Sequence, residues 1–297
     1  QMGRVRVKNS VSTAGTAPQR FTFPEPFSVT PVLVLMPTTA GGQPATVRVR
    51  DVTPTGFGAW LTEPLGEDGP HAQQEVAYLA VVPGVHTLPG GKKLEARMIS
   101  TTKQVWGGGS KCKPKGAASS WERVSFSAGF SQAPAFIAGI QTEANERRRV
   151  PRKPSEPFLY VAAKDVKTSS ASVSLGRAEA GKTDLVTVPE TIGWIAFQPG
   201  TFNIAQATCR AVLSGKLVTG WGKPVNVPFG VDLKTNKPLV VASIASYFGS
   251  DGGWLRLQSS SKTGSRFVID EDRTCDKERD HTKEQVGLLA CNKPIAL

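Results

Sequence analysis

Histidine and its polar neighbours are the residues of this chain best suited to chemistry. The chain has three histidines, and two of them occupy equivalent places. Aligning Tyr78 with Leu288 sets His71 on His281. Since a histidine ring nitrogen can donate or accept a hydrogen bond, this recurring position is a candidate for holding the hydroxyl groups of a ligand.

The same alignment extends the pattern to a third place in the chain. Gln74 falls on Glu284, and the middle of the sequence offers Thr187 and Glu190 there. A polar corner therefore recurs just before three apolar strands. Such a corner could bind a sugar, or its polar groups could fasten loops.

Two aromatic residues follow these corners. Tyr78 and Trp194 lie at equivalent positions in the apolar runs. If exposed, either ring would supply a stacking face for a sugar. The other interpretation is that Trp194 belongs to the core, as tryptophan in an apolar run commonly does.

The motifs of common enzymes are missing from the sequence. It contains no Gly-x-Ser-x-Gly elbow, no phosphate-binding Gly-x-x-x-x-Gly-Lys-Ser/Thr and no His-Glu-x-x-His. We therefore expect a protein that is not an enzyme and needs no cofactor. A degraded hydrolase using Asp270 or Glu271 is the remaining enzymatic hypothesis.

Positive charge is concentrated in the middle of the chain. The formal net charge is +12, of which residues 93–206 carry +7. The focus is Arg147, Arg148 and Arg149, where nearby prolines indicate an extended loop. It could present guanidinium groups to an acidic polysaccharide, or be an ordinary solvated loop. No nucleic-acid-binding signature accompanies it, so we expect no nucleic-acid partner.

Acidic residues cluster once, around Asp270, Asp272 and Asp276. Oxygen ligands at this density could bind calcium, although their spacing is not that of an EF-hand. Interleaved basic residues favour instead a solvated loop held by salt bridges.

The four cysteines form no Cys-x-x-Cys pair, which argues against structural zinc. Spacing within the third copy favours a Cys275–Cys291 disulfide, which leaves Cys112–Cys209 as a bond between copies. Four unpaired thiols are the alternative. Disulfides would place the protein in an oxidising compartment.

A threefold repeat of about a hundred residues organises the whole sequence. Proline-headed apolar runs begin at Pro31, Pro134 and Pro238, and each is followed later by a second apolar run. Short segments of period two lie between them and indicate strands with one wet face. We predict an all-β protein of three six-stranded antiparallel sandwiches over residues 1–92, 93–206 and 207–297.

These residues resemble the H-type lectin fold. The resemblance rests on Phe-x-x-x-Phe-x-x-x-Pro before an apolar strand, on Asp51–Phe57 with its Asp-Val-Thr turn, and on Gly193–Ala196. It implies six-stranded sandwiches that assemble as trimers and bind N-acetylgalactosamine-type sugars near the subunit seams. Three copies in one chain would then form a pseudo-trimer.

The sequence thus predicts an extracellular or cell-surface protein that binds glycans or acidic polysaccharide through its end loops. The alternative is a structural module of a surface appendage, filament or matrix, assembled by protein contacts without sugar affinity. No apolar stretch approaches the roughly 20 residues that a membrane-spanning helix needs. No signal peptide is recognisable, so an exported protein would be represented by its mature form or a fragment.

Overall fold

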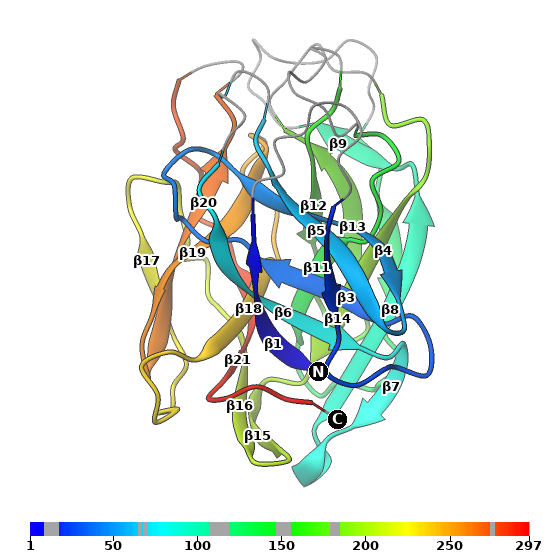
Figure 1. Ribbon diagram of the computed structural model, residues 1–297, viewed down its shortest axis with the longest axis vertical. Helices are drawn as coiled ribbons and strands as arrows, with labels where there is room; N and C mark the ends of the chain where they lie inside the picture. The colour runs from blue at the N-terminus through cyan, green and yellow to red at the C-terminus, as the bar shows by residue number, and fades with distance from the viewer. Residues whose placement is uncertain are drawn as a thin grey trace.

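The fold is all-β, as the alternating segments predict. The computed structural model describes residues 1–8, 18–64, 67, 71–106, 119–146, 156–178, 185–273 and 277–296. Antiparallel strands dominate this part of the chain, and they group into three units that follow one another in sequence (Figure 1).

Each unit contains two sheets with a three-stranded core, to which further strands are added in places. The strands of unit 1 are β1 Met2–Val7, β2 Gln19–Thr22, β3 Val32–Met36, β4 Thr46–Thr53, β5 Gly56–Thr62 and β6 Gln74–Val81. Those of unit 2 are β8 Lys93–Thr101, β9 Gln104–Trp106, β10 Glu122–Ser125, β11 Ala135–Ile140, β12 Leu159–Lys164, β13 Ser170–Arg177 and β14 Glu190–Phe197. Those of unit 3 are β16 Ala207–Leu213, β17 Val225–Pro228, β18 Leu239–Ile244, β19 Gly253–Ser260, β20 Gly264–Glu271 and β21 Val286–Cys291.

The same strand order recurs in every unit. The inner sheets are β1-β6-β3, β8-β14-β11 and β16-β21-β18, and the outer sheets are β2-β5-β4, β10-β13-β12 and β17-β20-β19. In unit 2, β9 adds a parallel strand beside β13. Two short strands, β7 Gly84–Thr87 and β15 Gly200–Ile204, lie in the segments that connect the units.

The proline-headed strands are apolar throughout because both faces of the inner sheets are buried. All five residues of β3 are buried. Leu33 and Leu35 pack into the sandwich core of unit 1, whereas Val32 and Val34 join a cluster that includes residues of the other two units. A strand buried on both faces needs a continuous apolar run. In the outer sheets, the short edge strands β2, β10 and β17 alternate between more and less exposed residues.

The three inner sheets pack around a common axis. β3 contacts β14 and β8 of unit 2, β11 contacts β21 and β16 of unit 3, and β18 contacts β6 and β1 of unit 1. β3, β11 and β18 also contact one another. This cyclic pattern of contacts makes the chain a pseudo-trimer, with the three inner sheets at its centre.

Small side chains allow the units to approach closely at these crossings. Ala77, Gly193 and Gly287 occupy equivalent positions in β6, β14 and β21. A Cβ atom on Gly287 would lie 2.0 Å from the backbone oxygen of Phe136 in β11, and one on Gly193 would lie 2.8 Å from Val32 Cγ1. Nothing larger than hydrogen fits at Gly287 without moving backbone.

The connections between units close the ring. β7, which follows unit 1, pairs with β8 of unit 2, and β15, which follows unit 2, pairs with β16 of unit 3. After unit 3, Ile295 returns to pair with Met2 through two backbone hydrogen bonds of 2.8 and 2.9 Å. Figure 1 accordingly shows both chain ends at the lower end of the molecule.

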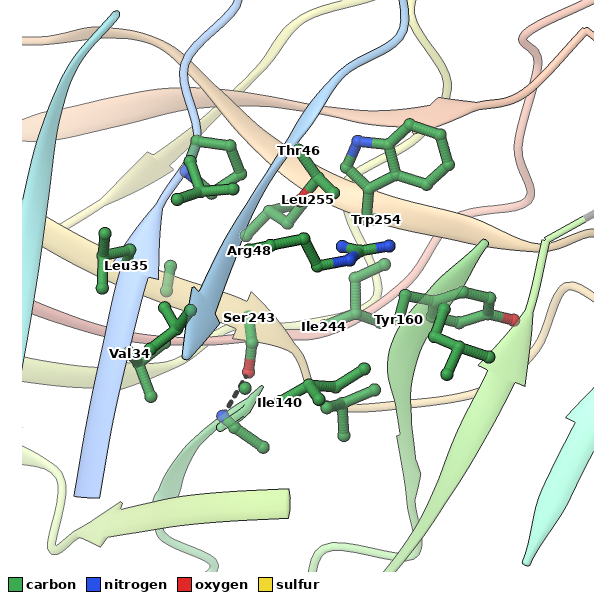
Figure 2. A pocket seen from close by; sticks show the side chains of 18 of the residues that line it. Val34, Leu35, Thr46, Arg48, Ile140, Tyr160, Ser243, Ile244, Trp254 and Leu255 are labelled. Carbon is green, nitrogen blue, oxygen red and sulfur yellow. Dashed lines mark hydrogen bonds between the residues drawn. The ribbon is translucent and has the colours of Figure 1, made fainter. Parts of the chain in front are cut away.

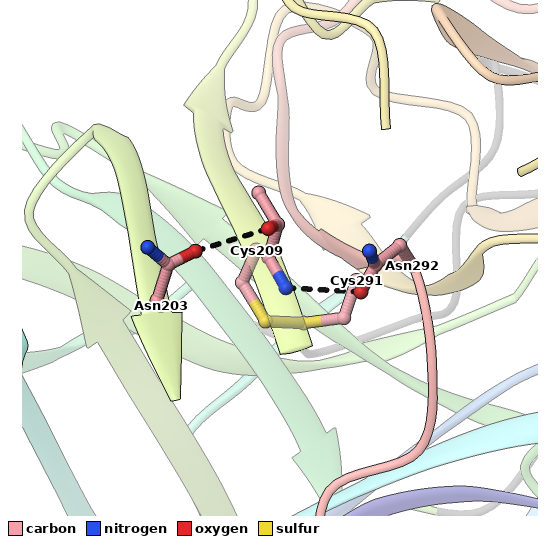
Figure 3. Close-up of a disulfide and its surroundings, with 5 residues drawn as sticks. Asn203, Cys209, Cys291 and Asn292 are labelled. Carbon is pink, nitrogen blue, oxygen red and sulfur yellow. Dashed lines mark hydrogen bonds between the residues drawn. A yellow bond between two sulfur atoms is a disulfide. The ribbon is translucent and has the colours of Figure 1, made fainter. Parts of the chain in front are cut away.

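A disulfide joins Cys209 to Cys291 and corrects both pairings predicted from spacing. These cysteines stand directly opposite each other in β16 and β21, and both are fully buried (Figure 3). Their proposed partners, Cys112 and Cys275, lie outside the described residues. The bond closes a sequence separation of 82 residues, for which chain entropy predicts a stabilisation of about 4 to 5 kcal/mol.

Candidate functional site

The three recurring polar corners fasten loops. Glu284 accepts hydrogen bonds from Ser246 Oγ, from the amide of Phe248 at 2.7 Å and from the amide of Gly249 at 2.8 Å. These residues form the loop that follows β18. The corner residue at the start of β21 therefore fixes the loop beside it.

Gln74 and Glu190 make equivalent contacts. Gln74 Oε1 accepts from the amide of Thr38, after β3, at 2.8 Å. Glu190 accepts from Thr142 Oγ1 and from the amides of Ala144 and Asn145, after β11. Both corner side chains are fully buried, so their hydrogen-bonding capacity is used inside the protein.

The two histidines differ in their surroundings. His71 is buried and pairs through Nδ1 with the carbonyl of the adjacent Ala72; burial lowers its pKa. His281 is buried between two carboxylates, with Nδ1 against Glu271 and Nε2 3.4 Å from Glu284. Burial disfavours the charged imidazolium, but hydrogen bonds and attraction from both carboxylates outweigh it and raise the pKa of His281 to about 9.

The two aromatic residues predicted as stacking faces lie in the sandwich cores. Tyr78 packs against Phe23 and Phe57, and Trp194 packs against Phe126 and Phe136. Both rings are buried, so the exposure that the stacking prediction requires is not met.

A different aromatic group lies at the seam between units 2 and 3. Tyr247, in the loop that Glu284 fixes, makes an edge contact with Trp121 of unit 2 at 5.2 Å between ring centroids. The next residue, Phe248, is 54% exposed. These three rings, with Lys164 and Lys216, are called the aromatic seam below.

Both lysines of the aromatic seam stand over rings. Lys164 Nζ lies 4.3 Å from the ring centroid of Trp121, and Lys216 Nζ lies 3.9 Å from that of Phe248. An ammonium over an aromatic face is held by the ring quadrupole. The seam therefore combines apolar ring surface with positive charge, which suits a ligand that has an apolar face and acidic groups.

The seam between units 3 and 1 is closed by a charged network instead. Asp270 accepts from Arg256 Nη1 at 2.6 Å and from Arg279 Nε at 2.7 Å. Arg256 also donates to the carbonyls of Thr38 and Gln43 in unit 1. The half-buried ring of Trp221 is covered by both guanidinium groups, Arg279 at 3.7 Å and Arg256 at 5.1 Å.

A buried ion pair marks the seam between units 1 and 2. Arg48 donates from Nε and Nη2 to the carboxylate of Glu146, and its guanidinium lies 4.6 Å from the ring centroid of Phe158. Both charged side chains are buried. Of the three seams, within the described residues, the one between units 2 and 3 presents a strongly exposed ring.

The acidic cluster was interpreted as a solvated, salt-bridged loop, with calcium binding as the alternative; its described members Asp270 and Asp272 are instead fully buried. Asp270 is neutralised by its two arginines, and Glu271 pairs with His281. Asp276 lies outside the described residues. Within the described ranges, no group of three or more histidine, cysteine, aspartate or glutamate side chains is arranged to hold a metal ion.

An axial cavity of about 90 Å³ lies where β3, β11 and β18 end. Side chains from all three units surround it, and the amide of Ala138 donates to Ser243 Oγ at 3.0 Å across a unit boundary (Figure 2). Its volume suits a few water molecules rather than a sugar.

The basic residues Arg147, Arg148 and Arg149 lie outside the described residues. The aromatic seam was missed in the sequence, although one signal was available. Tyr247 and Phe248 stand where the equivalent loops of units 1 and 2 carry Thr39-Ala40 and Glu143-Ala144, so this aromatic pair is unique to one copy.

Comparisons of the chain with protein families, with curated proteins and with solved structures give no match. Function must therefore be inferred from the geometry of the described residues. None of their helices is both long enough and apolar enough to cross a membrane.

Proposed function

We propose that this protein is a non-enzymatic, extracellular glycan-binding protein that recognises acidic glycans at the aromatic seam. The observation that carries the proposal is the exposed ring of Phe248, with Lys216 over it. The preceding residue, Tyr247, contacts Trp121, whose ring lies under Lys164. A ring can stack on the apolar face of a pyranose, and an ammonium can pair with a uronic carboxylate or a sulfate.

The scaffold supports this assignment. Glu284 holds the backbone of Phe248 and Gly249 by two amide hydrogen bonds, so the loop is ordered before a ligand arrives. A preorganised loop loses little conformational entropy on binding. The Cys209–Cys291 disulfide is compatible with an oxidising, extracellular compartment.

The seam also agrees with what the H-type lectin resemblance implies, a sugar site near a boundary between sandwiches. The residues differ from those expected, because the recurring corners are occupied by loop backbone. The polar corner residue Glu284 thus does not contact the ligand in this proposal; it positions the loop that carries Phe248.

Binding of acidic and neutral glycans to the protein and to Phe248→Ala tests the proposal. We expect an acidic glycan to be bound by the native protein and about five- to 150-fold more weakly by the variant, since a stacked ring contributes on the order of 1 to 3 kcal/mol. Val29→Ala is the control, because Val29 is 48% exposed and belongs to unit 1.

A charge-matched pair of variants completes this test. Lys216→Gln should weaken acidic-glycan binding, whereas Lys223→Gln, which removes the same charge elsewhere on unit 3, should not. Binding that disappears in moderate salt and responds equally to both lysine changes would indicate general polyanion attraction and contradict the proposed site.

A structural module is the second candidate, favoured by the closure of all three corners and of two seams by internal contacts. In that case the native protein should bind no glycan on an array at micromolar concentration. It should instead self-associate in sedimentation experiments.

A further inference from the structure

A second cavity, of about 390 Å³, opens at the base of the molecule, near the chain ends. It is called the base cavity below. Inner-sheet residues such as Leu79, Phe197 and Leu289 line it together with residues of all three ring-closing segments, for example Val82, Ile204 and Ile295.

Most of the lining is apolar, and Gln1, His86 and Thr87 supply its polar groups. Val81, Leu88 and Ile204 are half-buried side chains that pack on the central hydrophobic cluster, and the cavity gives them a common wall. The segment Val82–Thr87 is held in place by His86, whose Nε2 donates to the carbonyl of Val82 at 2.8 Å. A volume of this size and chemistry is within the range of small-molecule sites.

Positive charge stands beside this apolar space. Thr87 lines the cavity, and Lys93 Nζ donates to Thr87 Oγ1 at 3.0 Å. No carboxylate of the described residues is paired with Lys93 in a salt bridge. An apolar tail in the cavity would therefore bring an acidic head group within reach of an ammonium.

We propose that the base cavity binds a medium-chain fatty acid or a similar amphipathic carboxylate, with its tail against Leu79, Phe197 and Leu289 and its carboxylate toward Lys93. This site is separate from the aromatic seam, and it goes beyond the proposed glycan binding.

Calorimetric titration with octanoate, decanoate and dodecanoate, each below its critical micelle concentration, tests the proposal. Burial of one methylene contributes about 0.8 kcal/mol, so each should strengthen binding by about fourfold until the cavity is full. Affinity that does not change with chain length would overturn the assignment.

Two variants with one matched control locate the site. Val82→Trp and Ile204→Trp place an indole in the cavity from different connections and should each weaken dodecanoate binding at least tenfold. Val85→Trp adds the same ring on β7, at a side chain 44% exposed and outside the lining, and should change affinity less than twofold. Thermal unfolding checks that each variant is folded, and equal binding by all three would refute the site.

The position of the head group is tested separately with Lys93→Gln. This variant should weaken dodecanoate binding by about three- to fivefold, as expected for a partly exposed ion pair, and leave dodecanol binding unchanged. An equal effect on both ligands, or on neither, would contradict a carboxylate at Lys93.

Discussion

At the scale of residues, the corner of unit 3 is the most consequential. His281 shares its two ring nitrogens between Glu271 and Glu284, and all three side chains are buried. Burial raises the pKa of Glu271 to about 7, against the opposing effect of His281. Hydrogen bonds from His281, Ser246 and the loop amides overcome burial and lower the pKa of Glu284.

These pKa values make stability depend on pH in a defined direction. The pKa of His281 rises from 6.5 to about 9 on folding. Its contribution is therefore fully present below pH 6.5 and is lost as pH rises through 9. The raised pKa of Glu271 acts in the same direction between about 4.5 and 7.

We predict that His281→Gln removes most of the fall in unfolding free energy between pH 6.5 and 9. For the native protein this fall should be on the order of 2 to 3 kcal/mol. Urea unfolding at a series of pH values measures it. His86→Gln is the control, since the His86 ring pairs with a carbonyl, and an unchanged slope in His281→Gln would refute the coupling.

The sequence located these polar residues and left two roles open for them, sugar binding and loop fastening; the hydrogen bonds show the second. The repeat alignment placed His281 and Glu284 at one corner, because a period in a sequence specifies equivalent positions. The alignment could not reveal that the loop after β18 folds over Glu284. That contact joins Ser246 to Glu284, which are 38 positions apart in the chain. The exposure of Phe248 depends on the same fold-back.

At the scale of elements, strand order and register determine which residues become neighbours in a sheet. The spacing of residues along the chain does not show this. Apolar runs and alternation predicted the strands, since periodicity reports directly which faces are buried. The disulfide was mispredicted because β16 and β21 are neighbours in one sheet, so that Cys209 faces Cys291. Distance along the chain contains no information about that register.

The crossing of β21 over β11 gives a sharp prediction. Gly287→Ala should destabilise the protein by about 2 to 4 kcal/mol, because the new methyl group overlaps the backbone of Phe136. Gly222→Ala, where a Cβ meets nothing within 4 Å, should stay within about 0.5 kcal/mol of the native protein. Chemical denaturation compares the two, and similar values would mean that units 2 and 3 can separate without cost.

At the scale of the whole molecule, ring closure is the main structural feature. Leu88–Lys92 join the paired residues Thr87 and Lys93 between units 1 and 2. Between units 3 and 1, the paired residues Ile295 and Met2 are joined by hydrogen bonds alone. The boundary between units 3 and 1 thus has one strand bridge and no covalent connection, whereas β7 and β8 pair over four residues and are joined by the chain.

A circular permutant should fold. Leu297 would be linked to Gln1 through about two glycines, and the chain opened between Gly90 and Gly91, both exposed. This moves the break to the boundary between units 1 and 2. We expect a melting temperature within a few degrees of the native one by calorimetry. A permutant opened between Ile137 and Ala138, inside buried β11, is the control and should not fold.

The pseudo-trimer agrees with what the H-type lectin resemblance implies, but the difference between its seams could not be predicted. Each seam depends on a few side chains brought together from separate copies, such as Arg256 with the carbonyl of Gln43. The repeat pattern describes what the copies share, whereas the candidate site is made of what they do not share.

The covalent continuity of the three units has an evolutionary consequence. In an assembly of identical subunits, every amino-acid replacement occurs at all boundaries at once. Here a replacement affects one boundary only. Two boundaries can therefore keep the contacts that hold the units together while the third boundary changes. Selection can thus alter the region around Phe248 without weakening the joints made by Arg48 and Arg256.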